Sequence, residues 1–209
     1  MPSSVHPEQA GLAPRLERRV GRWVGLVAYL FALAGGAVLV GIVLMTVMSI
    51  LGRGLGSYSR EIPFLRGLGP VPGDFELVEA GTAVAVFAFL PWCQLRRGHV
   101  TVDVFLFWAS PRMRAVLGLV GNILMTGATT FIAWRLYYGL LDRIAFRETT
   151  MILGMPVWYG YALAFAGACV FVLVSAYTVW RSINEVARGE DPASAGETQP
   201  ASSQSAGTT

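Results

Sequence analysis

Four long apolar segments alternate with short polar segments along the chain. They cover approximately residues 23–51, 75–95, 112–141 and 155–180. Each is close to, or longer than, the roughly 20 residues with which an α-helix crosses the hydrocarbon core of a bilayer. The pattern therefore predicts an all-α integral membrane protein with four transmembrane helices, which form one membrane domain over residues 23–181.

A short apolar run lies between the second and third predicted spans. Residues 104–109 read VFLFWA, which is too short to cross a bilayer. We expect a short interfacial helix here. Ser110 and Pro111 then have the residue types of an N-cap and a first helical position, so they should open the third span.

The two ends of the chain are polar. Residues 1–22 are predicted to be a cytoplasmic N-terminal lead, and residues 182–209 a disordered cytoplasmic tail rich in Ser, Gly, Ala, Thr and Pro. A cleaved signal peptide is the alternative for the first apolar segment, because basic residues precede it. We reject this alternative because the segment is far longer than a signal-peptide core and no small-residue cleavage site follows it.

Charge decides the orientation and excludes some partners. The chain is 54% hydrophobic and 14% charged, and all 16 basic residues are arginine. These arginines flank apolar spans instead of gathering on one folded face, which argues against a nucleic-acid partner. Arginine is enriched on the cytoplasmic side of membrane proteins. Both termini are therefore predicted to be cytoplasmic, on the side that carries Arg15, Arg18, Arg19, Arg22, Arg96, Arg97, Arg112, Arg114, Arg181 and Arg188.

The loop after the second span is predicted to be a structural joint at the cytoplasmic surface. The arginines should lie among the headgroups of membrane lipids, the glycine should allow a tight exit from the span, and the aspartate should cap the short helix. The residues concerned are Arg96, Arg97, Gly98, His99 and Asp103.

The sequence offers no pattern typical of catalysis or of a bound cofactor. The two histidines, His6 and His99, lie outside the spans, so they cannot ligate a haem buried in the membrane. Neither a nucleophile–base arrangement nor a phosphate-binding loop is present. We therefore expect no enzyme activity, no cofactor and no metal. A cofactor-free membrane anchor or assembly subunit of a redox complex remains an alternative function.

Charged residues near the span ends are predicted to face the outer membrane interface. Asp74 is a candidate N-cap of the second span, and Arg53 closes the first. Glu79 and Arg135 lie at similar depths on antiparallel spans, so an ion pair between them is one hypothesis. The simpler interpretation, which we favour, is that each side chain extends to water or that Arg135 contacts another subunit.

Three spans carry stripes of small or polar residues at helical spacing. Such faces let transmembrane helices approach closely or form hydrogen bonds between them. Packing within the chain and docking onto another membrane subunit both remain open as explanations. The residues are Ala28, Ala32 and Gly36 in the first span, Asn122, Thr126, Thr129 and Ala133 in the third, and Gly160, Ala164 and Ala168 in the fourth.

Short motifs resemble those of the small permease subunit of tripartite ATP-independent periplasmic (TRAP) transporters, the DctQ-like family. Residues 97–103, RGHVTVD, are similar to the family's G-H-[IV]-x-[VI]-D motif after span two. Further similarities are Pro72-Gly73 with Glu76-Leu77, the run 154–158 with Tyr161, and Arg53, although Gly54 stands where a tyrosine often follows. The resemblance covers about residues 20–185.

The resemblance implies a function that the composition does not reveal. It implies a multi-pass protein of the bacterial inner membrane whose partners are a large TRAP permease subunit and a periplasmic substrate-binding protein. The large subunit would hold the substrate and sodium sites for organic acid uptake. The small subunit would brace it as a scaffold and help to receive the binding protein, so no substrate-binding residue is expected in this chain.

Overall fold

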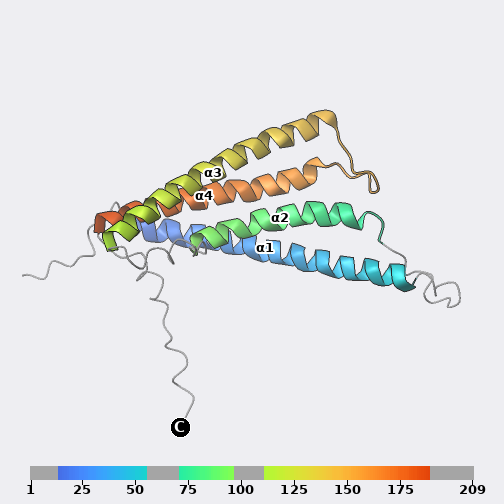
Figure 1. Ribbon diagram of the computed structural model, residues 1–209, viewed down its shortest axis with the longest axis horizontal. Helices are drawn as coiled ribbons and strands as arrows, with labels where there is room; N and C mark the ends of the chain where they lie inside the picture. The colour runs from blue at the N-terminus through green and yellow to red at the C-terminus, as the bar shows by residue number, and fades with distance from the viewer. Residues whose placement is uncertain (1–13, 56–70, 97–110, 189–209) are drawn as a thin grey trace, which may run out of the picture.

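Four α-helices make up the computed structural model, which describes residues 14–55, 71–96 and 111–188. Each helix is long and apolar enough to cross a membrane, which confirms the prediction of four helical spans. Within these ranges the only β-structure is an isolated bridge between Thr149 and Pro156. The helices are α1 (Pro14–Leu55), α2 (Asp74–Leu95), α3 (Pro111–Phe146) and α4 (Trp158–Arg188) (Figure 1).

The helix limits differ from the limits of the apolar segments. Helix α2 matches its segment closely, whereas α1 begins at Pro14 inside the predicted lead and α4 continues to Arg188 inside the predicted tail. Backbone hydrogen bonds do not require apolar side chains, so a hydrophobic run marks the part of a helix that crosses the membrane and not its ends. The expected interfacial helix at 104–109, together with Arg97, Gly98, His99 and Asp103, lies outside the described residues.

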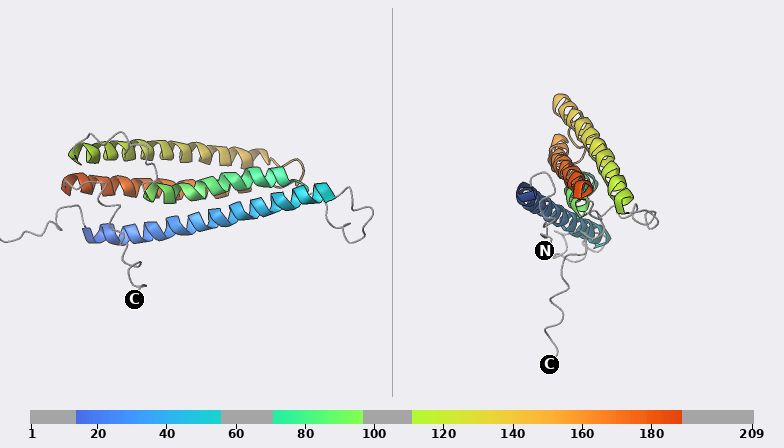
Figure 2. Two further views of the ribbon diagram at one scale, coloured as in Figure 1. Left: turned by 60° about the horizontal axis from the view of Figure 1, so that its bottom comes forward. Right: turned by 90° about the vertical axis from the view of Figure 1, so that its left-hand side faces the viewer.

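The helices lie side by side in the order α1, α2, α4, α3 (Figures 1 and 2). Helix α2 packs on both α1 and α4, while α3 packs mainly on α4. Two helical hairpins, α1–α2 and α3–α4, are thus joined through the contact of α2 with α4. We call the end where α1 stops and α2 begins the outer end, after the orientation predicted from the arginine pattern, and the opposite end the inner end.

Small residues bring α1 against α2. Gly35, Ile42 and Ser49, seven residues apart along α1, all contact α2. This period suits long helices that cross at a shallow angle. A Cβ atom added to Gly35 would lie 2.8 Å from the Cβ of Ala88 and 3.3 Å from the carbonyl oxygen of Ala85. A Cβ on Gly81 of α2 would lie 2.5 Å from Cδ1 of Ile42. Close contact between these two helices therefore depends on glycine on both sides.

Helix α4 packs on the other side of α2 in the same manner. A Cβ on Gly167 would lie 2.9 Å from the carbonyl oxygen of Phe87, and a Cβ on Gly160 would lie 3.4 Å from the Cβ of Ala80. Ala164 and Ala168 are 3% and 2% exposed. The small residues predicted on the fourth span thus pack within the chain.

Candidate functional site

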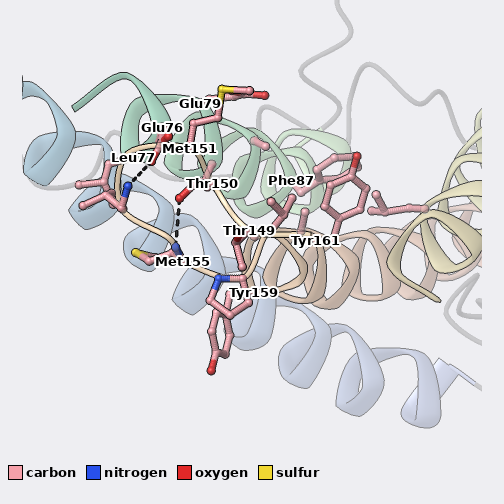
Figure 3. A pocket seen from close by; sticks show the side chains of 18 residues that line it. Glu76, Leu77, Glu79, Phe87, Thr149, Thr150, Met151, Met155, Tyr159 and Tyr161 are labelled. Atoms are coloured by element: carbon pink, nitrogen blue, oxygen red, sulfur yellow. Dashed lines mark hydrogen bonds between the residues drawn. The ribbon is translucent and has the colours of Figure 1, made fainter. Parts of the chain in front are cut away.

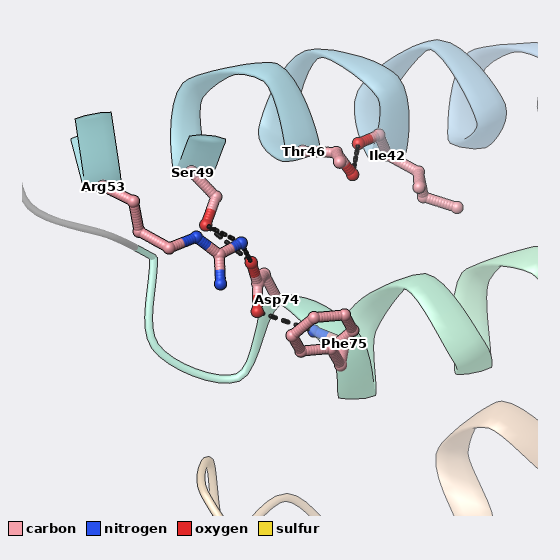
Figure 4. Close-up of polar contacts among 6 residues, drawn as sticks. All are labelled: Ile42, Thr46, Ser49, Arg53, Asp74 and Phe75. Carbon is pink, nitrogen blue, oxygen red and sulfur yellow. Dashed lines mark hydrogen bonds and ion pairs between the residues drawn. The ribbon is translucent and has the colours of Figure 1, made fainter. Parts of the chain in front are cut away.

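Asp74, the first residue of α2, ties α2 to the end of α1 (Figure 4). Its Oδ2 accepts a hydrogen bond of 2.6 Å from Ser49 Oγ and an ion-pair contact of 2.5 Å from Arg53 Nη2. Arg53 follows Ser49 by one helical turn, so both donors reach the same oxygen. We call these three residues the Asp74 clasp.

The prediction that Asp74 is the N-cap of α2 was wrong by one residue. The N-cap of α2 is Gly73, whose φ of 73° lies in the left-handed region that glycine adopts readily. Asp74 is buried, and its Oδ1 accepts the backbone N–H of Phe75 at 3.0 Å. Asp74 therefore links α1 to α2, and it also accepts a backbone hydrogen bond at the start of α2.

Glu76, two residues further along α2, holds the connection between α3 and α4. Its two carboxylate oxygens accept the backbone N–H groups of Ile152 at 2.7 Å and Leu153 at 3.0 Å. The connection itself, residues 147–157, turns back on itself, with hydrogen bonds from Thr150 N to Met155 O at 2.9 Å and from Met155 N to Thr150 Oγ1 at 3.1 Å (Figure 3). Glu76 thus fixes the second hairpin to the first at the outer end.

Two further contacts complete this outer-end junction. The side chain of Leu153 occupies the space where a Cβ on Gly73 would lie, so the glycine provides room as well as its backbone conformation. Arg143, in the last turn of α3, forms an ion pair with Glu148 and lies 5.5 Å from the centre of the Tyr161 ring of α4. The loop is therefore anchored near its start, through Glu148, and in its middle, through Leu153.

A cleft of about 520 Å³ lies beneath this loop, between α2, α3 and α4 (Figure 3). Its lining is predominantly apolar and includes four alanine or glycine positions, and the exposed Glu79 is among its acidic residues. The lining residues are Glu76, Leu77, Glu79, Ala80, Ala83, Phe87, Leu136, Thr149, Thr150, Met151, Leu153, Met155, Pro156, Val157, Tyr159, Gly160, Tyr161 and Ala164.

A group of buried and partly buried polar side chains joins three helices near the inner end. Gln94 Nε2 of α2 donates to Asn122 Oδ1 of α3 and to Thr178 Oγ1 of α4, both at 3.2 Å. Asn122 Nδ2 donates in turn to Ser182 Oγ of α4 at 2.7 Å. We call Gln94, Asn122, Thr178 and Ser182 the inner polar cluster. It links the two hairpins at the end opposite the Asp74 clasp.

Sequence reasoning found only part of the inner polar cluster. It singled out Asn122, and that residue does bond between helices. Thr126 and Thr129 instead donate to carbonyl oxygens of their own helix, those of Asn122 and Thr126. Gln94 was missed, although a lone amide at the end of an apolar span is a signal that it has a polar partner.

The remaining predicted residues are dispersed. Ala28 is fully buried, whereas a Cβ on Gly36 would meet nothing within 4 Å, so the tight contact on α1 passes through Gly35 and not through Gly36. Glu79 and Arg135 are both exposed and form no ion pair with each other, because α4 lies between α2 and α3. The guanidinium of Arg96 lies 4.6 Å from the centre of the Trp92 ring.

Within the described residues, no group of three or more His, Cys, Asp or Glu side chains could hold a metal ion.

Comparison with known proteins identifies the family. A search of curated proteins and a search of solved structures returned no match. A sequence model described as "Tripartite ATP-independent periplasmic transporters, DctQ component" matches residues 42–185, which is more than half of the chain.

Proposed function

Since the chain belongs to the DctQ family, the small permease component of TRAP transporters, we propose that it braces the large permease subunit during sodium-coupled uptake of an organic acid. A TRAP system is tripartite, and this component works with a large permease and a substrate-binding protein. The family is one of transporter components and not of enzymes. The sodium coupling, the organic acid and the bracing role are our proposals.

The observation that best supports a bracing role is the exposure of the helix row. Only 6% of the residues in the most apolar stretch of α1 are buried, and even in α4 the share is 39%. Helices α1 and α3, at the two ends of the row, each pack mainly on one other described helix. A membrane subunit that covers so little of its apolar surface is suited to lie along a larger one.

The distribution of charge supports a static role. Glu79 and Arg135 are the charged residues furthest inside the spans, and both lie toward the outer end. Ionisable residues at mid-membrane typically mark ion or substrate routes. We infer that the substrate and sodium sites lie in the large subunit, and that this chain supports it and offers outer-end surface to the binding protein.

Reconstitution tests the proposal directly. Liposomes that contain this chain alone should show no sodium-dependent uptake of organic acids, whereas addition of the large permease and the binding protein should restore uptake. A tagged chain purified from its native membrane should retain the large permease. Uptake by the pure chain, or loss of the permease during gentle purification, would refute the bracing role.

The location and orientation are part of the same proposal. We infer a multi-pass protein of the bacterial inner membrane with both termini in the cytoplasm, supported by the arginine distribution. Protease should therefore remove a C-terminal tag in inside-out vesicles and leave it intact in right-side-out vesicles. The opposite result would reverse the assignment of outer and inner ends.

A further inference from the structure

Small residues line the cleft beneath the α3–α4 loop where α2 meets α4. Its floor is the contact of α2 with α4, where Ala80 and Gly160 meet, and Ala83 and Ala164 continue it toward the inner end. Alanine and glycine let another helix backbone approach closely. Phe87, the deepest lining residue of α2, lies about 20 Å along the helix from its start at 1.5 Å per residue. The cleft therefore extends well into the membrane.

Glu79 gives this cleft a charge that no described side chain neutralises. The neighbouring acids Asp74, Glu76 and Glu148 bind Arg53, backbone amides and Arg143 respectively. Within the described part of the chain, Glu79 forms no hydrogen bond and no ion pair. It lies about 7 Å along α2 from its start. A carboxylate beside apolar walls at this depth is stabilised by a cationic partner.

We propose that the cleft receives a membrane helix of the large permease, and that a lysine or arginine of that helix binds Glu79. This inference rests on the proposed function, which supplies a partner in the same membrane. The carboxylate selects a basic side chain, the small-residue floor accommodates a helix, and the depth of the cleft places its occupant within the bilayer. A water-soluble binding protein could reach only the loop above the cleft.

Photocrosslinking identifies the occupant. A p-benzoylphenylalanine in place of Ala83, which lines the cleft and is exposed, is activated in membranes that contain all three components. The expected product joins this chain to the large permease, and it should be missing when the large permease is not expressed. Crosslinks to lipid alone, to the binding protein or to a second copy of this chain would overturn the inference.

Charge variants test the role of Glu79 independently of the bulky probe. In detergent, Glu79→Gln should weaken retention of the large permease about fivefold, the upper range for an exposed ion pair, and Glu79→Arg should weaken it further. Asp142→Asn is the matched control, because it also removes an exposed acid toward the outer end, and it should leave retention unchanged. Glu79 is exposed, so thermal unfolding of each variant alone should resemble that of the wild type.

The outcomes separate this inference from the proposed function. If the wild-type chain retains no large permease, the proposed function itself fails. If the wild type retains the permease while Glu79→Gln and Glu79→Arg do so equally well, only the assignment of the cleft is wrong.

Discussion

Adjacent glycines in α1 allow helix packing to be measured separately from helix propensity. Gly35 faces α2, whereas a Cβ on Gly36 would meet nothing within 4 Å. Alanine is favoured over glycine inside a helix by roughly 0.5–1 kcal/mol, and this gain should be nearly equal at two neighbouring positions. The difference in the free energy of unfolding between Gly35→Ala and Gly36→Ala therefore reports only the cost of the steric clash at the α1–α2 contact.

The size of that cost follows from the distances. The new methyl group at position 35 would lie 2.8 Å from the Cβ of Ala88 and 3.3 Å from the carbonyl oxygen of Ala85. Neither neighbour can rotate away, because one is a first side-chain atom and the other belongs to the backbone, so the helices must separate. Overpacking of this kind costs about 1–3 kcal/mol. We expect Gly35→Ala to be less stable than Gly36→Ala by that amount, and Gly36→Ala to equal or slightly exceed the wild type.

Reversible unfolding in mixed micelles measures both variants. The free energy of unfolding is obtained from the loss of tertiary contacts, followed by tryptophan fluorescence, with increasing mole fraction of a denaturing detergent. Helices that persist in the denatured state reduce the propensity gain at both positions alike, so the difference between the variants is preserved. Equal shifts for Gly35→Ala and Gly36→Ala would refute the conclusion that α1 meets α2 through Gly35.

Three other predictions concern the polar contacts of α2. Asn122→Leu should lower the free energy of unfolding by about 1 kcal/mol, and its effect should not add to that of Gln94→Leu; additive losses would show that the two residues are not coupled. Glu76→Gln should increase hydrogen–deuterium exchange of the Ile152 amide several-fold, and unchanged exchange would contradict its role in holding the loop. Asp74→Asn should lower the thermal unfolding temperature, because the Arg53 guanidinium loses its charged partner, and an unchanged temperature would contradict the clasp.

The sequence was sufficient to predict the four spans because hydrocarbon imposes a simple requirement on composition. An apolar run of bilayer length becomes a helix with internally satisfied backbone groups whatever its neighbours are. The limits of α2 were predicted closely for a local reason, since the Pro72-Gly73 turn and Arg96 bracket its apolar run. The ends of α1 and α4 were not, because their polar extensions remain helical.

Helix order could not be derived in the same way. Glu79 and Arg135 lie at similar depths on consecutive spans, and that match suggested an ion pair. Depth is a one-dimensional property, however, and α4 lies between the two helices. Lateral order depends on the shapes of all the contact faces together, which a reading of single spans does not provide.

The stripe on α1 shows a related difficulty. Four-residue spacing selected Ala28, Ala32 and Gly36, whereas the contact with α2 passes through Gly35, Ile42 and Ser49, at seven-residue spacing. A four-residue step turns about 40° around an α-helix in one direction, and a seven-residue step turns about 20° in the other. The two lines therefore diverge quickly beyond Ala28 and lie about a quarter of a turn apart at Gly35 and Gly36. Gly36 consequently remains a prediction for docking onto the partner subunit.

Helix α2 is the shortest of the four, yet the cohesion of the chain depends on it. Its first residue binds α1 through the Asp74 clasp, Glu76 binds the α3–α4 loop, and Gln94 near its last residue binds α3 and α4. Since apolar faces drive little association between helices inside a bilayer, such polar contacts and close glycine packing determine which helices stay together. A row of helices held together in this way can leave most of the surface of α1 and α3 uncovered without losing its own arrangement, and the proposed bracing role needs such an uncovered surface.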